Sequence, residues 1–347
     1  MKKTKIVRIK DIEIGGGRKI AVQSMLNVAT ADTAAALSQI DSLYKAGCDI
    51  VRLAVPDNEA ADAMREIIKA SPLPVVADIH FDYRLALRCI EYGVHKIRIN
   101  PGNLGGEEKA AAVARAALEA HIPIRIGVNG GSLEKGLLEK CGGDLPRAMV
   151  ESAKGHVDIL NRYGFDDIVL SMKSSDVKST IAAYRLASET FDYPLHLGVT
   201  EAGTTREGIV KSAIGIGSLL ADGIGDTIRV SLTDNPVCEI DAAKLILKPL
   251  GLGGDCVNVV SCPTCGRTKI DLIPIANAIT EATAHLNKKL KVAVMGCVVN
   301  GPGEASDADI GIAGGDGCAV LFKKGEICRK IAEDEIVDVL LKEIEEM

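Results

Sequence analysis

The sequence lacks tryptophan, and only 3% of its 347 residues are aromatic. The core must therefore be built from aliphatic residues and alanine, which supply most of the 47% of residues that are hydrophobic, together with 35 glycines. Such a composition is typical of an α/β protein with many buried parallel strands. The sequence also lacks any apolar run long enough to span a bilayer, so we expect no membrane segment.

An excess of positive charge is missing as well. The 41 lysines and arginines are outnumbered by 47 aspartates and glutamates, which gives a net charge of −6. This balance argues against general nucleic-acid binding but leaves room for a local basic pocket. A secretory signal is also absent, because Arg8, Lys10 and Asp11 interrupt the segment where its apolar stretch would lie. With ten cysteines and no such signal, the sequence predicts a protein of the reducing cytoplasm.

Three of the ten cysteines stand in a pattern typical of metal ligands. Cys262 and Cys265 are separated by two residues, and Cys297 follows in a glycine-rich stretch that ends at Glu304. Two thiols at this spacing can bind one metal centre, while glycines let the backbone come close and direct N–H groups at sulfur. We interpret the pattern as an iron–sulfur cluster held by three cysteines, with a weaker fourth ligand.

A structural zinc ion is the alternative, because Cys-Pro-x-Cys-Gly is also a zinc-knuckle pattern. A zinc ribbon repeats the cysteine pair, however, and no second cysteine follows Cys297 at the same spacing. Cys318 or Cys328 would have to complete such a site. Under the cluster interpretation all seven other cysteines are expected to be free buried thiols: Cys48, Cys89, Cys141, Cys238, Cys256, Cys318 and Cys328.

A unit of one short apolar strand and one alanine-rich helix recurs between residues 22 and 233. The expected strands cover residues 22–25, 50–55, 74–80, 96–100, 124–129, 168–173, 195–200 and 227–233. Helical periodicity lies between them, as at residues 33–46, 59–70, 81–92, 107–121 and 177–189. Eight strands that alternate with helices predict an α/β fold, the (β/α)8 TIM barrel. A doubly wound open sheet is the runner-up, although no Gly-x-Gly-x-x-Gly motif follows the first strand.

Basic residues lie near the carboxyl ends of these strands. Within a strand the polar positions are mostly two or four apart, so they share one face, which in a barrel is the inner one. Their end of the barrel is the mouth, where this fold carries out its chemistry. Five of them come from five strands: Arg52, Arg98, Arg125, Lys173 and Arg229. Burying them without counter-charge would be costly, so they predict a polyanionic ligand, most simply a diphosphate.

Further polar residues at the same strand ends complete the predicted substrate-binding set: Asn100, Asn129, Ser231, His80 and His196. A single histidine is more often structural than catalytic, which is the alternative role of the last two. Asp78 and Glu201 are carboxylates among the basic residues and are therefore acid/base candidates. For each of them a salt bridge that holds an arginine in place is the alternative.

The strand–helix pattern changes after Thr233, and the glycine-rich residues 248–255 suggest a junction. We predict a TIM-barrel domain for binding the diphosphate over residues 1–245 and a small α+β iron–sulfur domain over residues 246–347. In the second domain we expect strands at 256–260, 291–295 and 308–312, and helices at 273–290 and 333–346.

These segments together resemble the 4-hydroxy-3-methylbut-2-en-1-yl diphosphate synthase family in its bacterial two-domain form, over essentially the whole chain. The resemblance rests on VRLAVP (51–56), ADIHFD (77–82), KIRINPGN (96–103), RIGVN (125–129), SMKSSD (171–176), HLGVTEAG (196–203), IRVSLT (228–233), SCPTCGR (261–267) and GCVVNGPGE (296–304). It implies a 4Fe–4S cluster on Cys262, Cys265, Cys297 and Glu304, with Glu304 also catalytic through its exchange with substrate.

The resemblance further implies reductive ring opening and dehydration of 2-C-methyl-D-erythritol 2,4-cyclodiphosphate, a step of isoprenoid precursor biosynthesis. The product is 4-hydroxy-3-methylbut-2-enyl diphosphate, and flavodoxin or ferredoxin supplies two electrons. The family also implies a homodimer in which the cluster domain of one subunit covers the barrel mouth of the other.

Two other classes stay open at this point. One is a non-catalytic iron–sulfur or zinc protein that senses a phosphorylated metabolite. The other is a metal-free barrel of the pterin-synthase type with a zinc-binding tail. The colour and iron content of anaerobically purified protein separate the cluster from zinc, and turnover separates an enzyme from a sensor.

Overall fold

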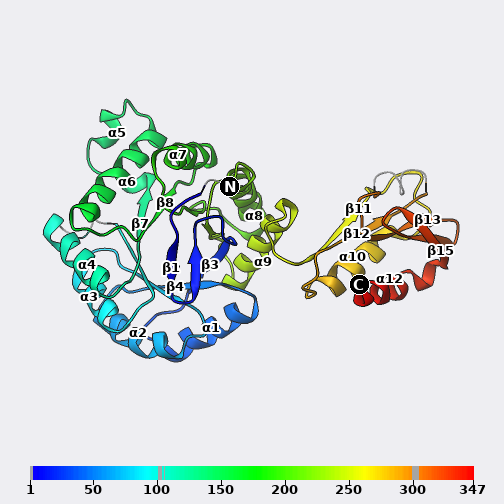
Figure 1. The fold of residues 1–347 in the computed structure, drawn as a ribbon, viewed down its shortest axis with the longest axis horizontal. Coiled ribbons are helices and arrows are strands. Elements are labelled where there is room, and N and C mark those ends of the chain that lie inside the picture. The colour runs from blue at the N-terminus through cyan, green and yellow to red at the C-terminus, as the bar shows by residue number, and fades with distance from the viewer. Residues whose placement is uncertain (1–2, 101–103, 105, 299–304) are drawn as a thin grey trace. The chain divides into compact units, whose positions relative to one another are not determined.

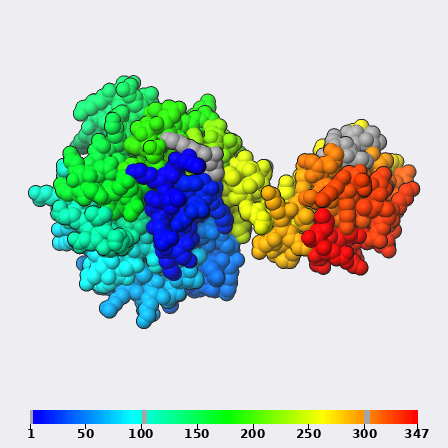
Figure 2. Space-filling model, viewed as in Figure 1, coloured from blue at the N-terminus to red at the C-terminus, as the bar shows by residue number. Residues whose placement is uncertain are grey.

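The computed structural model describes residues 3–100, 104, 106–298 and 305–347. The chain divides into two units, Met1–Leu250 and Gly251–Met347. Figure 1 and Figure 2 colour the first unit from blue to yellow and the second from yellow to red. The division falls inside the glycine-rich stretch at residues 248–255, a few residues after the predicted boundary.

Eight parallel strands form the sheet of the first unit, in the order β8-β7-β6-β5-β4-β3-β10-β9. A parallel bridge between Leu170 of β8 and Leu195 joins the two ends of this order. The sheet is thereby closed, which confirms the predicted (β/α)8 TIM barrel. The strands are β3 Ala21–Met25, β4 Ile50–Ala54, β5 Val75–Asp78, β6 Lys96–Ile99, β7 Ile124–Asn129, β8 Ile168–Lys173, β9 His196–Leu197 and β10 Thr227–Ile228.

Helices surround the barrel (Figure 1). They are α1 Thr33–Lys45, α2 Asn58–Ala70, α3 Tyr83–Glu91, α4 Glu107–Glu119, α5 Leu137–Lys140, α6 Leu145–Arg162, α7 Val177–Thr190, α8 Thr205–Ala221 and α9 Pro236–Leu247. An aspartate side chain accepts a hydrogen bond from a backbone N–H of the first turn in α1, α2, α3, α6 and α7. Each such cap stabilises its helix by about 1 kcal/mol and fixes the residue at which the preceding mouth loop ends.

A hairpin formed by β1 Val7–Ile9 and β2 Ile12–Ile14 closes the amino-terminal end of the barrel. The buried residues Val7, Ile9 and Ile14 pack against side chains near the beginnings of four barrel strands, namely Ala21, Ile50, Val76 and Val169. This apolar floor lies opposite the predicted mouth. The polar inward-facing residues come later in the same strands and therefore lie above this floor, toward the mouth.

The second unit contains a five-stranded sheet in the order β11-β12-β13-β14-β15, and two helices lie among its described residues. The first three strands are parallel, and the last two extend the sheet as antiparallel neighbours. The elements are β11 Val257–Ser261, α10 Leu272–Thr283, β12 Leu290–Met295, β13 Ile310–Gly315, β14 Cys318–Lys323, β15 Glu326–Ala332 and α12 Ile336–Glu346. Residues of both helices and of the sheet share one buried apolar cluster. This is the predicted α+β arrangement, although β14 and β15 had not been predicted.

β9 and β10 are shorter than the sequence predicts, with two ladder residues each. Gly198 accounts for the end of β9, because a Cβ at this position would lie 2.9 Å from the backbone oxygen of Arg229 and 2.6 Å from Lys173 Nζ. The backbone therefore passes close to its neighbours here instead of continuing a regular ladder. Within the part of the chain that the structure describes, none of the helices has the length and apolar character of a membrane span.

Candidate functional site

The sheet register brings several of the predicted mouth residues together. Asp78 of β5 is paired with Arg98 of β6, and Arg98 with Arg125 of β7. Further along, Asn129 of β7 is paired with Lys173 of β8. Paired residues on adjacent parallel strands point to the same side of a sheet, so these side chains share the inner face of the barrel.

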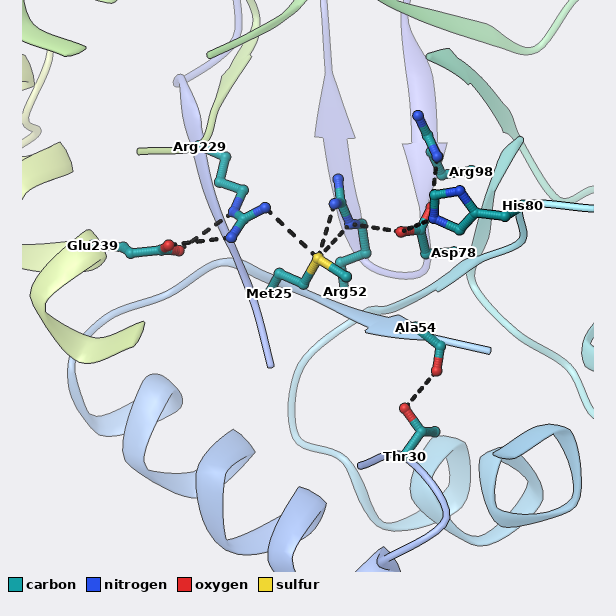
Figure 3. Close-up of polar contacts among 9 residues, drawn as sticks. All are labelled: Met25, Thr30, Arg52, Ala54, Asp78, His80, Arg98, Arg229 and Glu239. Atoms are coloured by element: carbon teal, nitrogen blue, oxygen red, sulfur yellow. Dashed lines mark hydrogen bonds and ion pairs between the residues drawn. The ribbon is translucent and has the colours of Figure 1, made fainter. Parts of the chain in front are cut away.

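Asp78 is the centre of the first polar cluster (Figure 3). Its side chain is 1% exposed; Oδ2 lies 3.5 Å from Arg52 Nε and 3.3 Å from His80 Nε2, and Oδ1 lies 3.2 Å from Arg98 Nη1. Burial alone would raise the pKa of this carboxyl. The charge of Arg52, the hydrogen bond with His80 and the charge of Arg98 together hold the pKa of Asp78 well below its ordinary value. Asp78 is therefore a carboxylate that holds three side chains in place.

Glu239 of α9 is the centre of a second cluster, on the other side of the mouth (Figure 3). Arg229 Nη2 lies 3.1 Å from Glu239 Oε1, and Ser24 Oγ donates to Oε2 at 2.8 Å. The sulfur of Met25 lies between the two clusters, 3.1 Å from Arg52 Nε and 3.6 Å from Arg229 Nη1. Sequence reasoning missed Glu239, because it lies on a helix after the last strand and not at a strand end.

Arg125 and Lys173 bring further positive charge into the mouth. Arg125 is 1% exposed, and its Nε and Nη1 have no hydrogen-bond partner among the described residues. Burial, followed by the charge of Arg125, lowers the pKa of Lys173 well below its ordinary value. The five predicted cations thus share the mouth with two buried carboxylates, Asp78 and Glu239. The surplus of charge and the unpaired donors are what a bound polyanion would satisfy.

Two glycines make room for these cations. A Cβ at Gly127 of β7 would lie 2.5 Å from Arg98 Nε, and one at Gly198 would lie 2.6 Å from Lys173 Nζ. Any larger residue would force the cation to move. The segments RIGVN and HLGVTEAG therefore carry both a polar residue of the mouth and the glycine that leaves space for a neighbouring cation.

The remaining predicted mouth residues lie near the strand ends. Asn100 is buried just after β6, whereas Asn129 and Ser231 are half-buried. Glu201 is exposed, with a φ of 53°. This left-handed conformation is uncommon for a residue with a side chain, and such backbone strain is concentrated at functional sites. It supports the choice of Glu201 as a candidate, whose role stays a prediction.

The two predicted histidines lie at different depths. His80 follows β5, and its side chain is 49% exposed beside Asp78. His196 is the first residue of β9 and is fully buried, with Nδ1 2.7 Å from Thr227 Oγ1. Burial, together with the surrounding cations, lowers the pKa of His196 well below its ordinary value. Inward-facing residues of a strand are two residues apart, and each lies one layer further from the mouth than the next one along the chain. His196, at the start of β9, therefore lies below the mouth.

The predicted metal ligands lie at one edge of the second sheet. Cys262 directly follows β11, and Cys297 follows β12 by one intervening residue, Gly296. Because β11 and β12 are parallel neighbours, their carboxyl ends meet. The Gly296 N–H donates to Cys262 Sγ at 3.2 Å, and Cys265 is exposed in the tight turn closed by a hydrogen bond from Thr268 N to its carbonyl oxygen, at 3.0 Å.

A bound iron–sulfur cluster fits this edge in its donor chemistry. All ten cysteines are free, and the three predicted ligands are half-buried or exposed. The Gly296 N–H already directed at a cysteine sulfur is the hydrogen bond that cluster thiolates accept. Among the described residues, histidine, cysteine and carboxylate side chains are not gathered in a group of three that would hold a metal ion. The predicted fourth ligand, Glu304, lies outside the described residues.

Family comparison covers both units. The GcpE TIM-barrel domain matches residues 4–244, and the GcpE protein C-terminal domain matches residues 258–346. The chain belongs to the GcpE family. The barrel with the basic mouth and the sheet with the cysteine edge are therefore the two domains of this family.

Several GcpE relatives are similar along their full length. Three of them bear the name 4-hydroxy-3-methylbut-2-en-1-yl diphosphate synthase (flavodoxin). The protein of Ruminiclostridium cellulolyticum is 59% identical over 99% of this chain and 98% of its own length. That of Caldanaerobacter subterraneus is 58% identical over 100% and 98%, and that of Clostridium perfringens is 57% identical over 99% and 99%.

Solved structures resemble the barrel of this GcpE protein in fold alone. The 3-dehydroquinate dehydratase of Geobacillus kaustophilus aligns with a TM-score of 0.50 and 16% identity, over 71% of this chain and 96% of its own. A truncated 3-deoxy-D-arabino-heptulosonate 7-phosphate synthase of Thermotoga maritima aligns with a TM-score of 0.50 and 12% identity, over 72% and 91%.

Proposed function

We propose that this protein is an iron–sulfur oxidoreductase, a 4-hydroxy-3-methylbut-2-en-1-yl diphosphate synthase. It converts 2-C-methyl-D-erythritol 2,4-cyclodiphosphate to 4-hydroxy-3-methylbut-2-enyl diphosphate with two electrons and two protons, and it releases water. The observation that carries the proposal is the buried basic mouth of a barrel whose full-length relatives bear this name. The reaction belongs to isoprenoid precursor biosynthesis.

The mouth residues bind and orient the diphosphate. Arg98, Arg125 and Arg229 present guanidinium groups, whose forks match phosphate oxygens, and Lys173 adds a point charge. Asp78 and Glu239 keep their arginines extended into the mouth, at 3.2 Å and 3.1 Å. Arg52, Asn100, Asn129, His80, His196 and Ser231 complete the proposed substrate-binding set.

Proton transfer is assigned to side chains at the rim. Because its pKa is held far below the ordinary range, Asp78 stays ionised and positions His80, Arg52 and Arg98 instead of donating a proton itself. Glu201 is exposed in a strained conformation and is the candidate that can exchange protons with solvent. Of the two predicted acid/base candidates, we therefore retain Glu201 as the catalytic one and assign Asp78 to positioning.

Cys262, Cys265, Cys297 and Glu304 would hold a 4Fe–4S cluster at the edge of the second sheet. When bound, such a cluster supplies single electrons and a Lewis-acidic iron. The Gly296 N–H supports the thiolate of Cys262 at 3.2 Å. A carboxylate is a weaker iron ligand than a thiolate, so we assign to Glu304 the exchangeable position.

The proposal extends to partners and location. The relatives are named for flavodoxin, and we propose flavodoxin, or ferredoxin in its place, as the electron donor. We further propose a homodimer, in which each cluster domain serves the barrel of the other subunit, and a cytoplasmic location, which suits ten free cysteines.

Anaerobic protein should contain about four irons and four acid-labile sulfides per chain and turn over the cyclic diphosphate with reduced flavodoxin. Colourless protein with one tightly bound zinc ion would contradict the cluster. An iron–sulfur protein that binds the diphosphate without turnover would be the sensor alternative.

Glu304→Gln tests the exchangeable ligand. We expect the variant to keep much of its iron but to lose most of its turnover, because a neutral amide binds iron poorly and cannot accept a proton as readily. Iron content and turnover are measured on the same preparation, with the exposed Glu281→Gln as the matched control. Wild-type turnover in Glu304→Gln would make Glu304 a bystander.

A further inference from the structure

Lys96 is a buried cationic residue that the proposed function does not use. It is the first residue of β6 and stands two residues before Arg98, so it points into the barrel one layer below the mouth. Its relative exposure is 0%, and Nζ has no hydrogen-bond partner among the described residues. Burying an ammonium group in this way is so unfavourable that its presence needs an explanation.

Other buried polar groups inside the barrel also lack a hydrogen-bond partner among the described residues. They are both amide atoms of Gln23 on β3, Nε and Nη1 of Arg125 on β7, and Nε2 of His196 on β9. Gln23 and His196 are 1% and 0% exposed. Four strands, with β6 included, therefore direct unsatisfied polar groups into the barrel interior.

The charged and titratable groups around Lys96 are mostly cations. Strand by strand, those inside the barrel are Arg52 on β4, Asp78 on β5, Arg98 on β6, Arg125 on β7, Lys173 on β8, His196 on β9 and Arg229 near the end of β10, and Arg229 is paired with Glu239 of α9. Asp78 and Glu239 are already engaged by arginines. Burial, followed by the charges of Arg125 and Arg52, lowers the pKa of Lys96 well below its ordinary value. The surroundings of Lys96 thus favour its neutral amine form over the ammonium form.

We propose that Lys96 is the proton acceptor of the diphosphate site: when the anion binds in the mouth, Lys96 Nζ takes up one proton from solvent and becomes a cation that attracts the ligand without touching it. This inference rests on the proposed function of the mouth. The step is balanced, since an amine and a proton give an ammonium ion and no other bond changes.

Electrostatics explains why the proton arrives with the ligand. A diphosphate neutralises the arginines that disfavour an ammonium at Lys96, and its charge acts strongly through the low-dielectric barrel interior. The pKa of Lys96 is therefore higher with ligand than without it. Between these two pKa values binding takes up a proton, so affinity for the anion increases as the pH falls through that window.

The test is calorimetric titration of the full-length, anaerobically purified protein with inorganic pyrophosphate. Repeating the titration in buffers of different ionisation enthalpy gives the number of protons taken up per ligand bound. Lys96→Met is compared with wild type and with the exposed Lys154→Met on α6. Protons exchanged by pyrophosphate itself are common to all variants and cancel in the difference.

We expect Lys96→Met to take up about one proton fewer than wild type and to bind roughly three- to tenfold more weakly. It should also melt at a higher temperature, because it removes an unpaired polar group from the core. Lys154→Met should match wild type in all three measurements. Lys96→Gln, which keeps a polar group, should lose the same proton and serves if the methionine variant does not fold.

Unchanged proton uptake in Lys96→Met and Lys96→Gln would overturn the inference while leaving the diphosphate site intact. Wild-type protein that does not bind pyrophosphate would instead contradict the proposed function of the mouth, and the inference would fall with it. The two failures are therefore distinguished by the wild-type titration alone.

Discussion

The barrel mouth and the cysteine edge of the second sheet are both proposed binding sites, but folding prepares them to different degrees. In the mouth, Asp78 and Glu239 hold arginines at 3.1–3.5 Å, and Arg125 is buried with unpaired donors. At the cysteine edge, the Gly296 N–H reaches the sulfur of Cys262, and Cys265 is exposed. Folding alone can form an anion site, because it can bury positive charges that lack partners. A metal site is completed only when the metal binds and brings its ligands together.

The largest expected effect is loss of the metal centre. Cys262→Ser, Cys265→Ser and Cys297→Ser should each abolish cluster binding, because three cysteines are the least that can anchor it. The matched control is Cys328→Ser, an exposed cysteine of the same unit. Iron and sulfide content and the visible spectrum are the measurements. Equal loss of iron in the control would show that the cysteine edge is not a defined site.

Asp78→Asn should be the most destabilising change in the mouth, by about 3–5 kcal/mol, because it leaves buried guanidinium groups without their counter-charge. The native pKa of Asp78 lies below its unfolded value, so its stabilisation is present above about pH 4 and is lost as the pH falls. The variant should therefore lose less stability than wild type below that pH. Urea unfolding at neutral and acidic pH measures both effects, and unchanged stability at neutral pH would mean that the mouth is not organised by Asp78.

Substitutions of two arginines of the mouth should weaken ligand binding alike but change the stability of the protein in opposite directions. Arg125→Ala and Arg229→Ala should each weaken pyrophosphate binding by roughly 1.5–3 kcal/mol, the range for a charge-assisted hydrogen bond. Arg125→Ala removes unpaired buried charge and should stabilise the protein, whereas Arg229→Ala leaves Glu239 unpaired and should destabilise it. Thermal melting beside calorimetric titration separates the two. Earlier melting of both with normal binding would make the basic mouth structural.

The smallest effect is expected from Gly127→Ala. The added Cβ would lie 2.5 Å from Arg98 Nε, which can move because it is near the end of a flexible side chain. Binding of pyrophosphate should weaken by about 1 kcal/mol with little change in melting temperature. The exposed Gly131→Ala, whose Cβ would meet no atom within 4 Å, is the control. Full affinity in Gly127→Ala would show that the position of Arg98 does not matter for the anion.

The sequence predicts the barrel well where strands alternate clearly. Residues 124–129 and 168–173 are strands with the predicted bounds, because apolar residues there follow the period of a pleated strand. It fails at β9 and β10, since a close approach between Gly198 and the backbone of Arg229 is a tertiary contact that no local pattern records. β15 was missed because it is mostly exposed, so its residues carry no hydrophobic alternation. β14 was missed although its apolar residues are largely buried.

The sequence predicted the basic residues of the mouth but not the carboxylate on α9 that pairs with one of them. Five basic residues at strand ends pointed to the mouth, but Glu239 was missed. In the stretch that forms α9, both Glu239 and Asp241 are acidic, and the structure buries the first and exposes the second. Lys96 was likewise read as part of a strand, because its lack of a partner is visible only once the neighbouring strands surround it.

The hairpin at the floor of the barrel has a consequence for how the chain folds during synthesis. Ile9 leaves the ribosome about 160 residues before Val169, which is a member of the same buried cluster. Until β8 has emerged, the apolar side of the hairpin lacks one of its packing surfaces and is open to wrong contacts. The hairpin is therefore synthesised early, but its packing is completed late. A chaperone that shields the first apolar residues of the nascent chain should raise the yield of folded protein more than one that acts on the second unit.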